Sequence, residues 1–396
     1  MTHSLKSEFL LNPDVVFLNH GSFGACPKAV FDTYQAWQRQ LEWQPVEFIG
    51  RRSLRLLAEA RGALAGYLGV ADPNNLVYFP NPTTAVNMVA RSLAAVGTQP
   101  ISGRDALKLG PGDEILTTDH EYPAMDQTWG FIAERTGASY THHPMPLPMT
   151  TPEAFVERFW SAVNPRTKVI FISHITCQTA VILPIEEIIR RARAAGILTI
   201  IDGAHAPSQI PLNLDALGAD IYVGACHKWL CAPKGAAFLY ARPEVQRLLD
   251  PLVISWGVGY EPVNGRSSLV AWQEPQGTRD PSAFLSVPAA IRFQAEHDWD
   301  AVRARCHALA VATRARIHAL TGLEMIAPEE WFSQLVSIRL PDDTDLDALR
   351  RALWEDYRIE VPIGRWNGQA YVRVSFQAYN DESDADALVH ALRKLL

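Results

Sequence analysis

Lysine is scarce in this chain of 396 residues: it occurs seven times, although lysine and arginine together number 36. Chemistry that needs an amine therefore has few candidates, namely Lys6, Lys28, Lys108, Lys168, Lys228, Lys234 and Lys394. The basic residues form no dense run, and the formal net charge is −7. Nucleic acid is therefore not an expected partner.

Long apolar runs and paired cysteines are also missing. No stretch reaches the ~18 apolar residues that span a bilayer, and residues 1–20 lack the basic start and apolar run of a secretion signal. The five cysteines form no C-x-x-C pair, which is typical of reduced thiols. Zinc held by Cys226, His227 and Cys231 would need a non-standard spacing, so no metal is expected. These features predict a cytoplasmic protein without a membrane partner.

A G-x-G-x-x-G turn is absent as well. Gly21-Ser-Phe-Gly24 and Gly257-Val-Gly259 both depart from this pattern. The turn is what a nicotinamide-dependent dehydrogenase would place after its first strand. The sequence thus argues against that class of enzyme.

Short β-branched runs alternate with amphipathic stretches between about residues 26 and 240, which predicts a mostly parallel α/β sheet between helices. The expected strands are Leu76–Phe79, Glu114–Thr118, Val169–His174, Ile197–Ile201, Ile221–Gly224 and Ala236–Tyr240. The expected helices are Arg51–Leu68, Thr84–Val96, Ala124–Thr136 and Ile185–Ala195.

The pattern changes after Gly257, where a stretch rich in Gly, Pro and Ser leads to long helical runs near 282–320. Strands are then expected at Leu335–Leu340, Ile359–Ile363 and Tyr371–Phe376, with helices near 344–355 and 381–395. We predict a large domain over residues 21–284 and a smaller C-terminal α+β domain over 285–396. Residues 1–20 are expected to pack near the active site and the small domain.

Two residues follow apolar strands and suggest a common site. Lys228 ends Ile221-Tyr-Val-Gly-Ala-Cys-His-Lys228, and Asp202 ends a strand in Ile200-Ile-Asp-Gly-Ala-His205. Open α/β sheets bind ligands beyond the carboxyl ends of their strands. A carboxylate there can pair with a protonated pyridine nitrogen and keep the ring an electron sink. Each residue alone could equally be a surface or capping residue, but the pair favours a cofactor site.

Two threonines mark a possible phosphate site. In Asn81-Pro-Thr-Thr-Ala-Val86 a strand turns into a helix, and Thr83 and Thr84 lie at the turn. Free backbone N–H groups and the helix dipole attract a phosphate there. Threonine also caps helices in the absence of any ligand, and the two roles are compatible.

Taken together, these motifs resemble the class V aminotransferase family of pyridoxal-5′-phosphate (PLP) enzymes with fold type I, and within it the isopenicillin N epimerase-like branch. The segments that carry the resemblance span nearly the whole chain: Leu18-Asn-His-Gly-Ser-Phe-Gly24, Thr83-Thr84, Asp119-His-Glu-Tyr122, Asp202-Gly-Ala-His205, His227-Lys-Trp-Leu230 and Val372-Arg-Val-Ser375.

The resemblance implies a role for each matching residue. Lys228 would bind PLP as an aldimine and move the α-proton of the substrate, and Asp202 would hold the pyridine nitrogen. The remaining cofactor contacts would come from Thr83, Thr84, Tyr122, His205, His227 and, across a homodimer interface, Thr278. Arg373 would bind the substrate carboxylate, with Asn19 and His20 nearby. Simpler structural roles stay open for Tyr122, His205 and His20.

The resemblance also bears on the reaction. Desulfurases of this superfamily carry a nucleophilic cysteine before the clamp arginine, and residues 361–370 contain none. Cys177 should run close to the ring without attacking the substrate. After the α-proton leaves, we expect epimerisation, for which Tyr122 could be a second acid, or loss of a β-substituent in a cysteine C–S lyase or desulfhydrase. Transamination of a small amino acid is the alternative.

Overall fold

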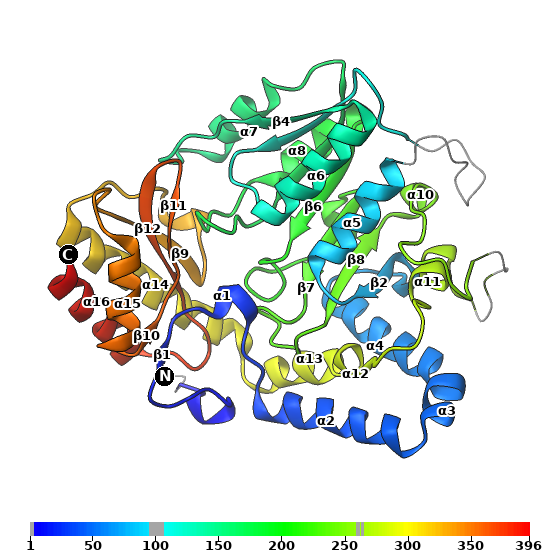
Figure 1. Ribbon diagram of the computed structural model, residues 1–396, viewed down its shortest axis with the longest axis horizontal. Coiled ribbons are helices and arrows are strands. Elements are labelled where there is room, and N and C mark those ends of the chain that lie inside the picture. Colours follow the sequence, from blue (N-terminus) through cyan, green and yellow to red (C-terminus); the bar gives the residue numbers. More distant parts are fainter. Residues whose placement is uncertain (1–3, 95–106, 259–261, 263–264) are drawn as a thin grey trace.

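A seven-stranded sheet forms the centre of the computed structural model, which describes residues 4–94, 107–258, 262 and 265–396 (Figure 1). The strand order is β2-β8-β7-β6-β5-β3-β4, and every neighbouring pair is parallel except the two that include β8. The strands are β2 (Leu76–Phe79), β3 (Glu114–Thr118), β4 (Ser139–His143), β5 (Thr167–Ser173), β6 (Leu198–Gly203), β7 (Ile221–Ala225) and β8 (Ala237–Ala241). The predicted mostly parallel sheet is confirmed.

Helices cover both faces of this sheet because its strands are apolar on both sides. Alternate strand residues such as Val169 and Phe171 pack in one core with α5 and α6, whereas Ile170 and Ile172 pack in the other with α4 and α8. The helices up to residue 285 are α1 (His20–Phe23), α2 (Lys28–Trp43), α3 (Pro45–Glu47), α4 (Ser53–Tyr67), α5 (Pro82–Leu93), α6 (Pro123–Thr136), α7 (Pro152–Trp160), α8 (Ile185–Ala194), α9 (Leu214–Leu217), α10 (Pro243–Gln246), α11 (Ser268–Gln273) and α12 (Ser282–Leu285). The predicted helix 84–96 thus begins two residues earlier, and its last two residues lie outside the described ranges.

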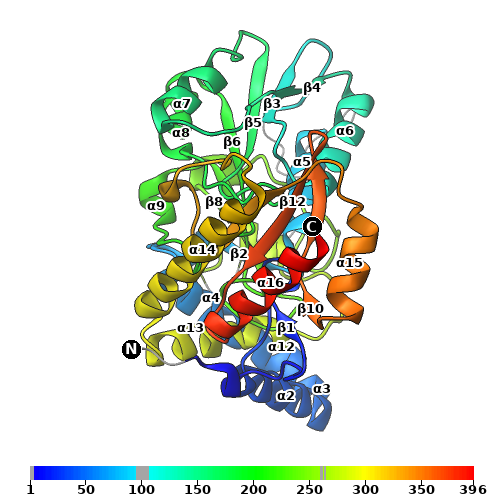
Figure 2. The ribbon, with the colours of Figure 1, turned by 90° about the vertical axis from the view of Figure 1, so that its left-hand side faces the viewer.

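A second, three-stranded antiparallel sheet lies beside the first, in the order β11-β12-β9 (Figures 1 and 2). Its strands are β9 (Leu335–Leu340), β11 (Ile363–Trp366) and β12 (Gln369–Ser375), and the helices of this part are α13 (Val287–Glu296), α14 (Trp299–Thr321), α15 (Leu346–Glu355) and α16 (Glu382–Leu395). The chain therefore ends in an α+β unit, as the sequence predicts. The boundary at residue 285 falls at the end of α12 and stays a prediction.

Two strand assignments need correction. The single strand expected at Ile359–Ile363 is two: β10 (Ile359–Glu360) pairs with β1 (Val16–Phe17), and β11 pairs with β12. Pro362 lies between them and has no N–H to continue a ladder. Strand β4 was not predicted, because Ser-Tyr-Thr-His-His is polar and the strand lies at the sheet edge.

The early segment runs between the two sheets and passes close to the predicted lysine. Strand β1 pairs with β10, and the N–H of Leu18 donates to the Glu360 carbonyl. Gly24 has φ +70°, and a Cβ placed there would lie 1.9 Å from the carbonyl oxygen of His227. Only glycine fits that close approach.

The described residues contain no helix with the length and apolar character needed to cross a bilayer. Nor do they bring together three His, Cys, Asp or Glu side chains in a group that could hold a metal ion.

Candidate active site

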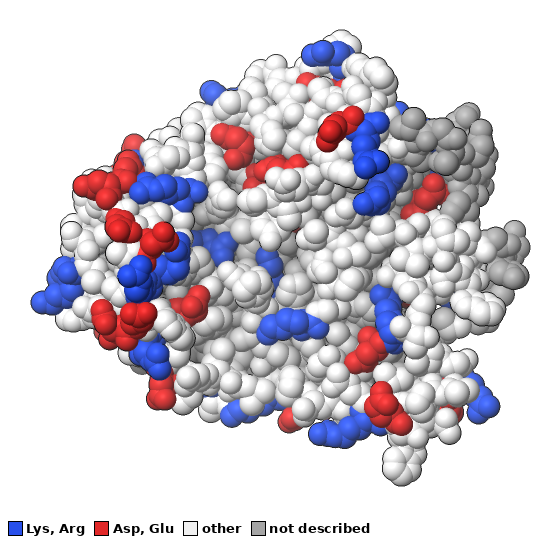
Figure 3. Space-filling model, viewed as in Figure 1, with Lys and Arg blue, Asp and Glu red and all other residues white. Residues whose placement is uncertain are grey.

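A cavity of about 180 Å³ opens where the carboxyl ends of β5, β6 and β7 meet the N-terminus of α5. The face of the molecule in Figure 3 is visibly hollowed between the two sheets, with basic side chains inside the hollow. Six of the predicted site residues lie in the cavity wall: Thr83, Tyr122, Asp202, His205, His227 and Lys228. The structure thus gathers residues from four separate segments into one pocket.

Lys228 is half-buried, and its hydrogen bonds indicate a neutral amine. Its Nζ lies 2.9 Å from His205 Nε2, while Trp229 Nε1 donates to His205 Nδ1 at 3.3 Å. Burial lowers the pKa of His205 well below its usual value, so the ring is neutral. Because Nδ1 accepts a hydrogen bond, the proton of the neutral ring lies on Nε2, which donates a hydrogen bond to Lys228 Nζ. Burial also lowers the pKa of Lys228, and a desolvated neutral amine is a good nucleophile.

Asp202 supplies the acidic group of the pocket. Its Oδ1 accepts the N–H of Ala204 at 2.9 Å, which fixes the carboxyl group at the end of β6. Burial raises its pKa, and the hydrogen bond from the Ala204 N–H only partly opposes this. A buried carboxyl group that ionises reluctantly is suited to a cationic partner in the cavity.

The N-terminus of α5 forms another part of the wall through Asn81, Pro82 and Thr83. Asn81 caps the helix: its Oδ1 accepts the N–H of Thr84 at 2.8 Å and the Thr84 hydroxyl at 3.0 Å. The hydroxyl of Thr84 is thus engaged with the cap, while Thr83 faces the cavity. His227 also lines the wall, with Nδ1 3.1 Å from the Ala236 carbonyl oxygen.

Arg373 lies behind the cavity wall on β12 and contacts two residues that line it. Its Nη1 donates to the Cys177 carbonyl at 2.6 Å and lies 3.2 Å from Cys177 Sγ, and its Nη2 donates to Ser22 Oγ at 3.0 Å. Its Nε is buried without a partner. No ion pair among the described residues includes Arg373, so its charge is available for a carboxylate.

Asn19 and His20 do not line the cavity. Asn19 Nδ2 donates to Glu360 at 2.8 Å and so connects the early segment to β10. His20 is fully buried between the Tyr379 hydroxyl and the Lys228 carbonyl, each 3.0 Å away, and burial lowers its pKa to about 3. In this structure His20 therefore contacts the backbone of Lys228, whereas Asn19 contacts β10.

Thr278 lies elsewhere in the chain. It lines a second cavity with Leu54 and Trp256 that shares no residue with the first. Its predicted role needs a second subunit and is not tested by one chain. The sequence assigned no role to other wall residues: Met125 and Ser173 lie in no quoted motif, and Ser22 and Phe23 lie within the early one.

The pocket fits PLP by its donor set. It combines a neutral, half-buried lysine, a buried carboxyl group, a helix N-terminus and an aromatic ring, Tyr122, that is 42% exposed although it sits in the wall. In PLP, the lysine would bind the aldehyde, the carboxyl group the pyridine nitrogen, the helix N-terminus the phosphate and Tyr122 the face of the ring. The fold and the site together define an α/β enzyme built around a lysine-based cofactor pocket.

Comparison with known proteins agrees with that class. The family model "Aminotransferase class-V" matches residues 23–388. The isopenicillin N epimerase of Amycolatopsis lactamdurans is 37% identical, covering 98% of this chain and 97% of the relative. A putative L-cysteine desulfhydrase of Oryza sativa subsp. japonica is 30% identical, covering 96% and 83%. The solved structure of a C-DES variant with glycine covalently linked to its PLP cofactor has a TM-score of 0.81 at 23% identity, covering 99% of both chains.

The chain belongs to the class V aminotransferase family. This membership confirms the assignment made from the motifs, including the fold and the cofactor class, PLP.

Proposed function

We propose that this protein is a PLP-dependent enzyme that removes the α-proton of a small amino acid and then either epimerises the substrate or releases a sulfur substituent from its β-carbon. The observation that carries the proposal is the neutral Lys228 amine in one pocket with Asp202. The isopenicillin N epimerase and the cysteine desulfhydrase named above support these two outcomes.

The side chains divide the work by position. Bound PLP supplies an electron-withdrawing ring that stabilises the negative charge left when the α-proton departs. Lys228, as a neutral amine, would hold the cofactor through its aldehyde group and would accept the α-proton of the substrate. Asp202 holds the ring nitrogen, and the Thr83 end of α5 receives the phosphate. Arg373 binds the α-carboxylate through its planar fork.

Epimerisation needs a second acid to return the proton to the opposite side of the α-carbon. Besides Lys228, the cavity wall offers the Tyr122 hydroxyl and the Cys177 thiol. Elimination needs no second acid at the α-carbon, because the leaving sulfur takes the electron pair of the bond between the β-carbon and sulfur. The product therefore depends on whether one of these two residues delivers a proton.

The test is proton NMR in heavy water of the PLP-loaded enzyme with L-amino acids, including cysteine and S-substituted cysteines. Exchange of the α-proton with appearance of the D-form establishes epimerisation. Sulfide or thiol release with a keto acid establishes C–S cleavage, and a keto acid without sulfur release establishes transamination instead. The absence of exchange with every substrate would contradict the proposal.

Arg373→Lys should raise the KM for an amino acid roughly tenfold to a hundredfold with a smaller change in kcat, because lysine cannot reproduce a bidentate contact. Steady-state kinetics of the α-proton exchange measures both constants. Arg339→Lys, on the neighbouring strand β9 with Asp342 as partner, is the control. An unchanged KM for Arg373→Lys would remove it from the carboxylate site.

The homodimer is part of the proposal. Thr278 shares its cavity with Trp256, which is 86% exposed, and with Leu54, which is 43% exposed. Large apolar side chains with such high exposure mark an interaction surface. A second subunit covering them would bring its Thr278 toward the neighbouring phosphate site.

Trp256→Glu should weaken the dimer by at least about a hundredfold, since a charge would replace a central aromatic contact. Sedimentation velocity over a concentration series measures the dissociation constant. Trp354→Glu, 42% exposed on α15, serves as control and should leave the dimer intact. A wild-type protein that is monomeric and active would contradict the shared site.

A further inference from the structure

Glu121 is a buried carboxyl group beside the proposed cofactor pocket to which the reaction as described gives no task. It follows β3 and directly precedes Tyr122 in the chain. Its Oε1 accepts the Thr118 hydroxyl at 2.7 Å, and its Oε2 accepts the Ser173 hydroxyl at 2.6 Å. Two hydroxyl donors on two oxygens are the pattern of an ionised carboxylate.

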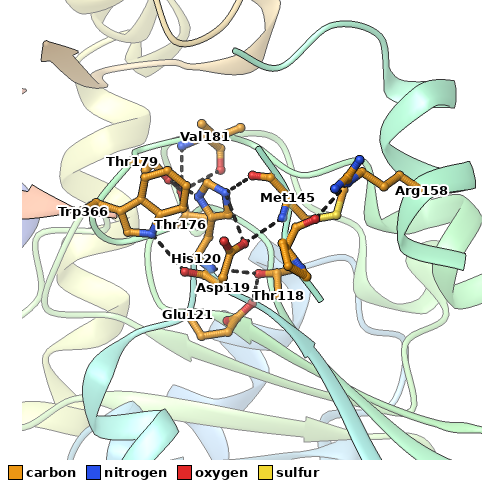
Figure 4. Close-up of polar contacts among 11 residues, drawn as sticks. Thr118, Asp119, His120, Glu121, Met145, Arg158, Thr176, Thr179, Val181 and Trp366 are labelled. Carbon is orange, nitrogen blue, oxygen red and sulfur yellow. Dashed lines mark hydrogen bonds and ion pairs between the residues drawn. The ribbon is translucent and has the colours of Figure 1, made fainter. Parts of the chain in front are cut away.

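The segment that carries Glu121 is held from both sheets (Figure 4). His120 Nδ1 and Nε2 lie 2.8 Å from the Thr179 hydroxyl and 2.7 Å from the Met145 carbonyl oxygen. Its ring stacks on Trp366 of β11 at 4.2 Å, and Trp366 Nε1 donates to the Asp119 carbonyl. Glu121 is therefore fixed in place rather than free to turn to solvent.

Ser173 connects Glu121 to Asp202. It ends β5, lines the cavity, and is the register partner of Asp202 on the parallel strand β6. Register partners on neighbouring strands point to the same face about 5 Å apart. A serine hydroxyl can donate one hydrogen bond, and here it donates to Glu121. The Ser173 hydroxyl therefore cannot donate to Asp202 as well, so it does not lower the basicity of Asp202 beyond what the Ala204 N–H does.

The charge of Glu121 itself also affects Asp202. Within the described residues no ion pair includes Glu121, and burial raises its pKa to about 7, with a smaller contribution from Asp202. On β4 it faces Tyr140 and His142, whose pKa values are raised mainly by burial and by the hydrogen bond to Asp126, respectively. Above about pH 7 Glu121 thus adds a second negative charge near Asp202.

We propose that Glu121 is a positioning residue that acts through Ser173 and Asp202 to keep the proton on the ring nitrogen of bound PLP. It does so in two ways: it holds the Ser173 proton away from Asp202, and its charge strengthens the field at the nitrogen. The inference rests on the proposed function, because it needs Asp202 to face that nitrogen.

Glu121→Gln is the main test, in protein loaded with PLP labelled with ¹⁵N in the ring. The amide has no charge and can donate to Ser173, which frees the serine proton for Asp202. We expect the nitrogen to lose its proton at a pH roughly one unit lower than in the wild type. The ¹⁵N shifts should coincide near pH 6, where Glu121 is mostly protonated, and separate toward pH 8. The dissociation constant of PLP should rise about fivefold to tenfold at pH 8.

A matched control and a second variant accompany it. Glu114→Gln changes a buried glutamate at the opposite end of β3 that also accepts hydroxyls, from Thr141 and Thr167, and should change neither readout. Thr118→Val removes one donor to Glu121 at similar volume and should shift the ¹⁵N titration in the same direction by less.

The outcomes separate the inference from the function it rests on. Superimposable ¹⁵N titrations and equal PLP dissociation constants for the wild type, Glu121→Gln and Thr118→Val would overturn the role of Glu121. Failure of the wild type to take up PLP would instead overturn the proposed function.

Discussion

Lys228→Ala should reduce α-proton exchange by about a thousandfold or more, because the variant loses both the amine that binds PLP covalently and the base that accepts the proton. Borohydride treatment of the wild type should fix the cofactor to the peptide that contains Lys228, and the variant should retain no covalently fixed cofactor. Mass spectrometry of the digested protein measures this directly, independently of any substrate.

Lys234→Ala provides the matched control for this result. Lys234 lies six residues later in an exposed turn and is the nearest lysine in the sequence. Its replacement should leave the fixed cofactor and the exchange rate unchanged. Labelling of Lys234, or unchanged exchange in Lys228→Ala, would place the chemistry elsewhere.

The sequence predicted the elements whose pattern is strong and local. Runs such as Val169–Ile172 are apolar at every position, so β5 could be recognised without its neighbours. The polar edge strand β4 has no such pattern, and its existence depends on pairing with β3. The split of Ile359–Ile363 needed the partners of each half, because Pro362 alone does not specify where two sheets begin.

In the site, too, local patterns could be predicted and contacts between distant residues could not. Lys228 and Asp202 could be predicted because each directly follows an apolar strand, and the ends of such strands meet. The contacts of Arg373 join residues 196 and 351 positions apart, at Cys177 and Ser22. No local pattern encodes such distances. The sequence likewise offered Asn19 and His20 as substrate contacts; in the structure Asn19 donates to Glu360 and the buried His20 lies against the Lys228 carbonyl.

The position of His205 explains how the pocket keeps its lysine reactive. A carboxylate beside Lys228 would hold it as a cation, but its nearest polar partner is a neutral imidazole whose tautomer is set by Trp229. The negative charge is kept instead at Asp202, on the neighbouring strand β6, where the ring nitrogen belongs. Separating the amine from the carboxylate lets the amine attack while the carboxylate binds a cation.

Asp202→Asn should lower the rate of α-proton exchange by roughly a thousandfold, because an amide cannot hold the proton on the ring nitrogen that makes the ring an electron sink. Asparagine keeps an acceptor oxygen for the Ala204 N–H, so the fold around β6 should persist. Exchange rates from NMR and the ¹⁵N shift of the ring nitrogen are the two measurements.

Asp220→Asn is the control, and it should affect stability rather than the ring nitrogen. Asp220 is buried, accepts the Thr199 N–H and pairs with Arg242, away from the pocket. Its replacement should lower the free energy of unfolding without changing the ¹⁵N shift of the ring nitrogen.

A PLP analogue methylated on the ring nitrogen carries its positive charge without a proton, and should restore part of the exchange in Asp202→Asn. No restoration would mean that Asp202 acts through the pocket structure rather than through the nitrogen.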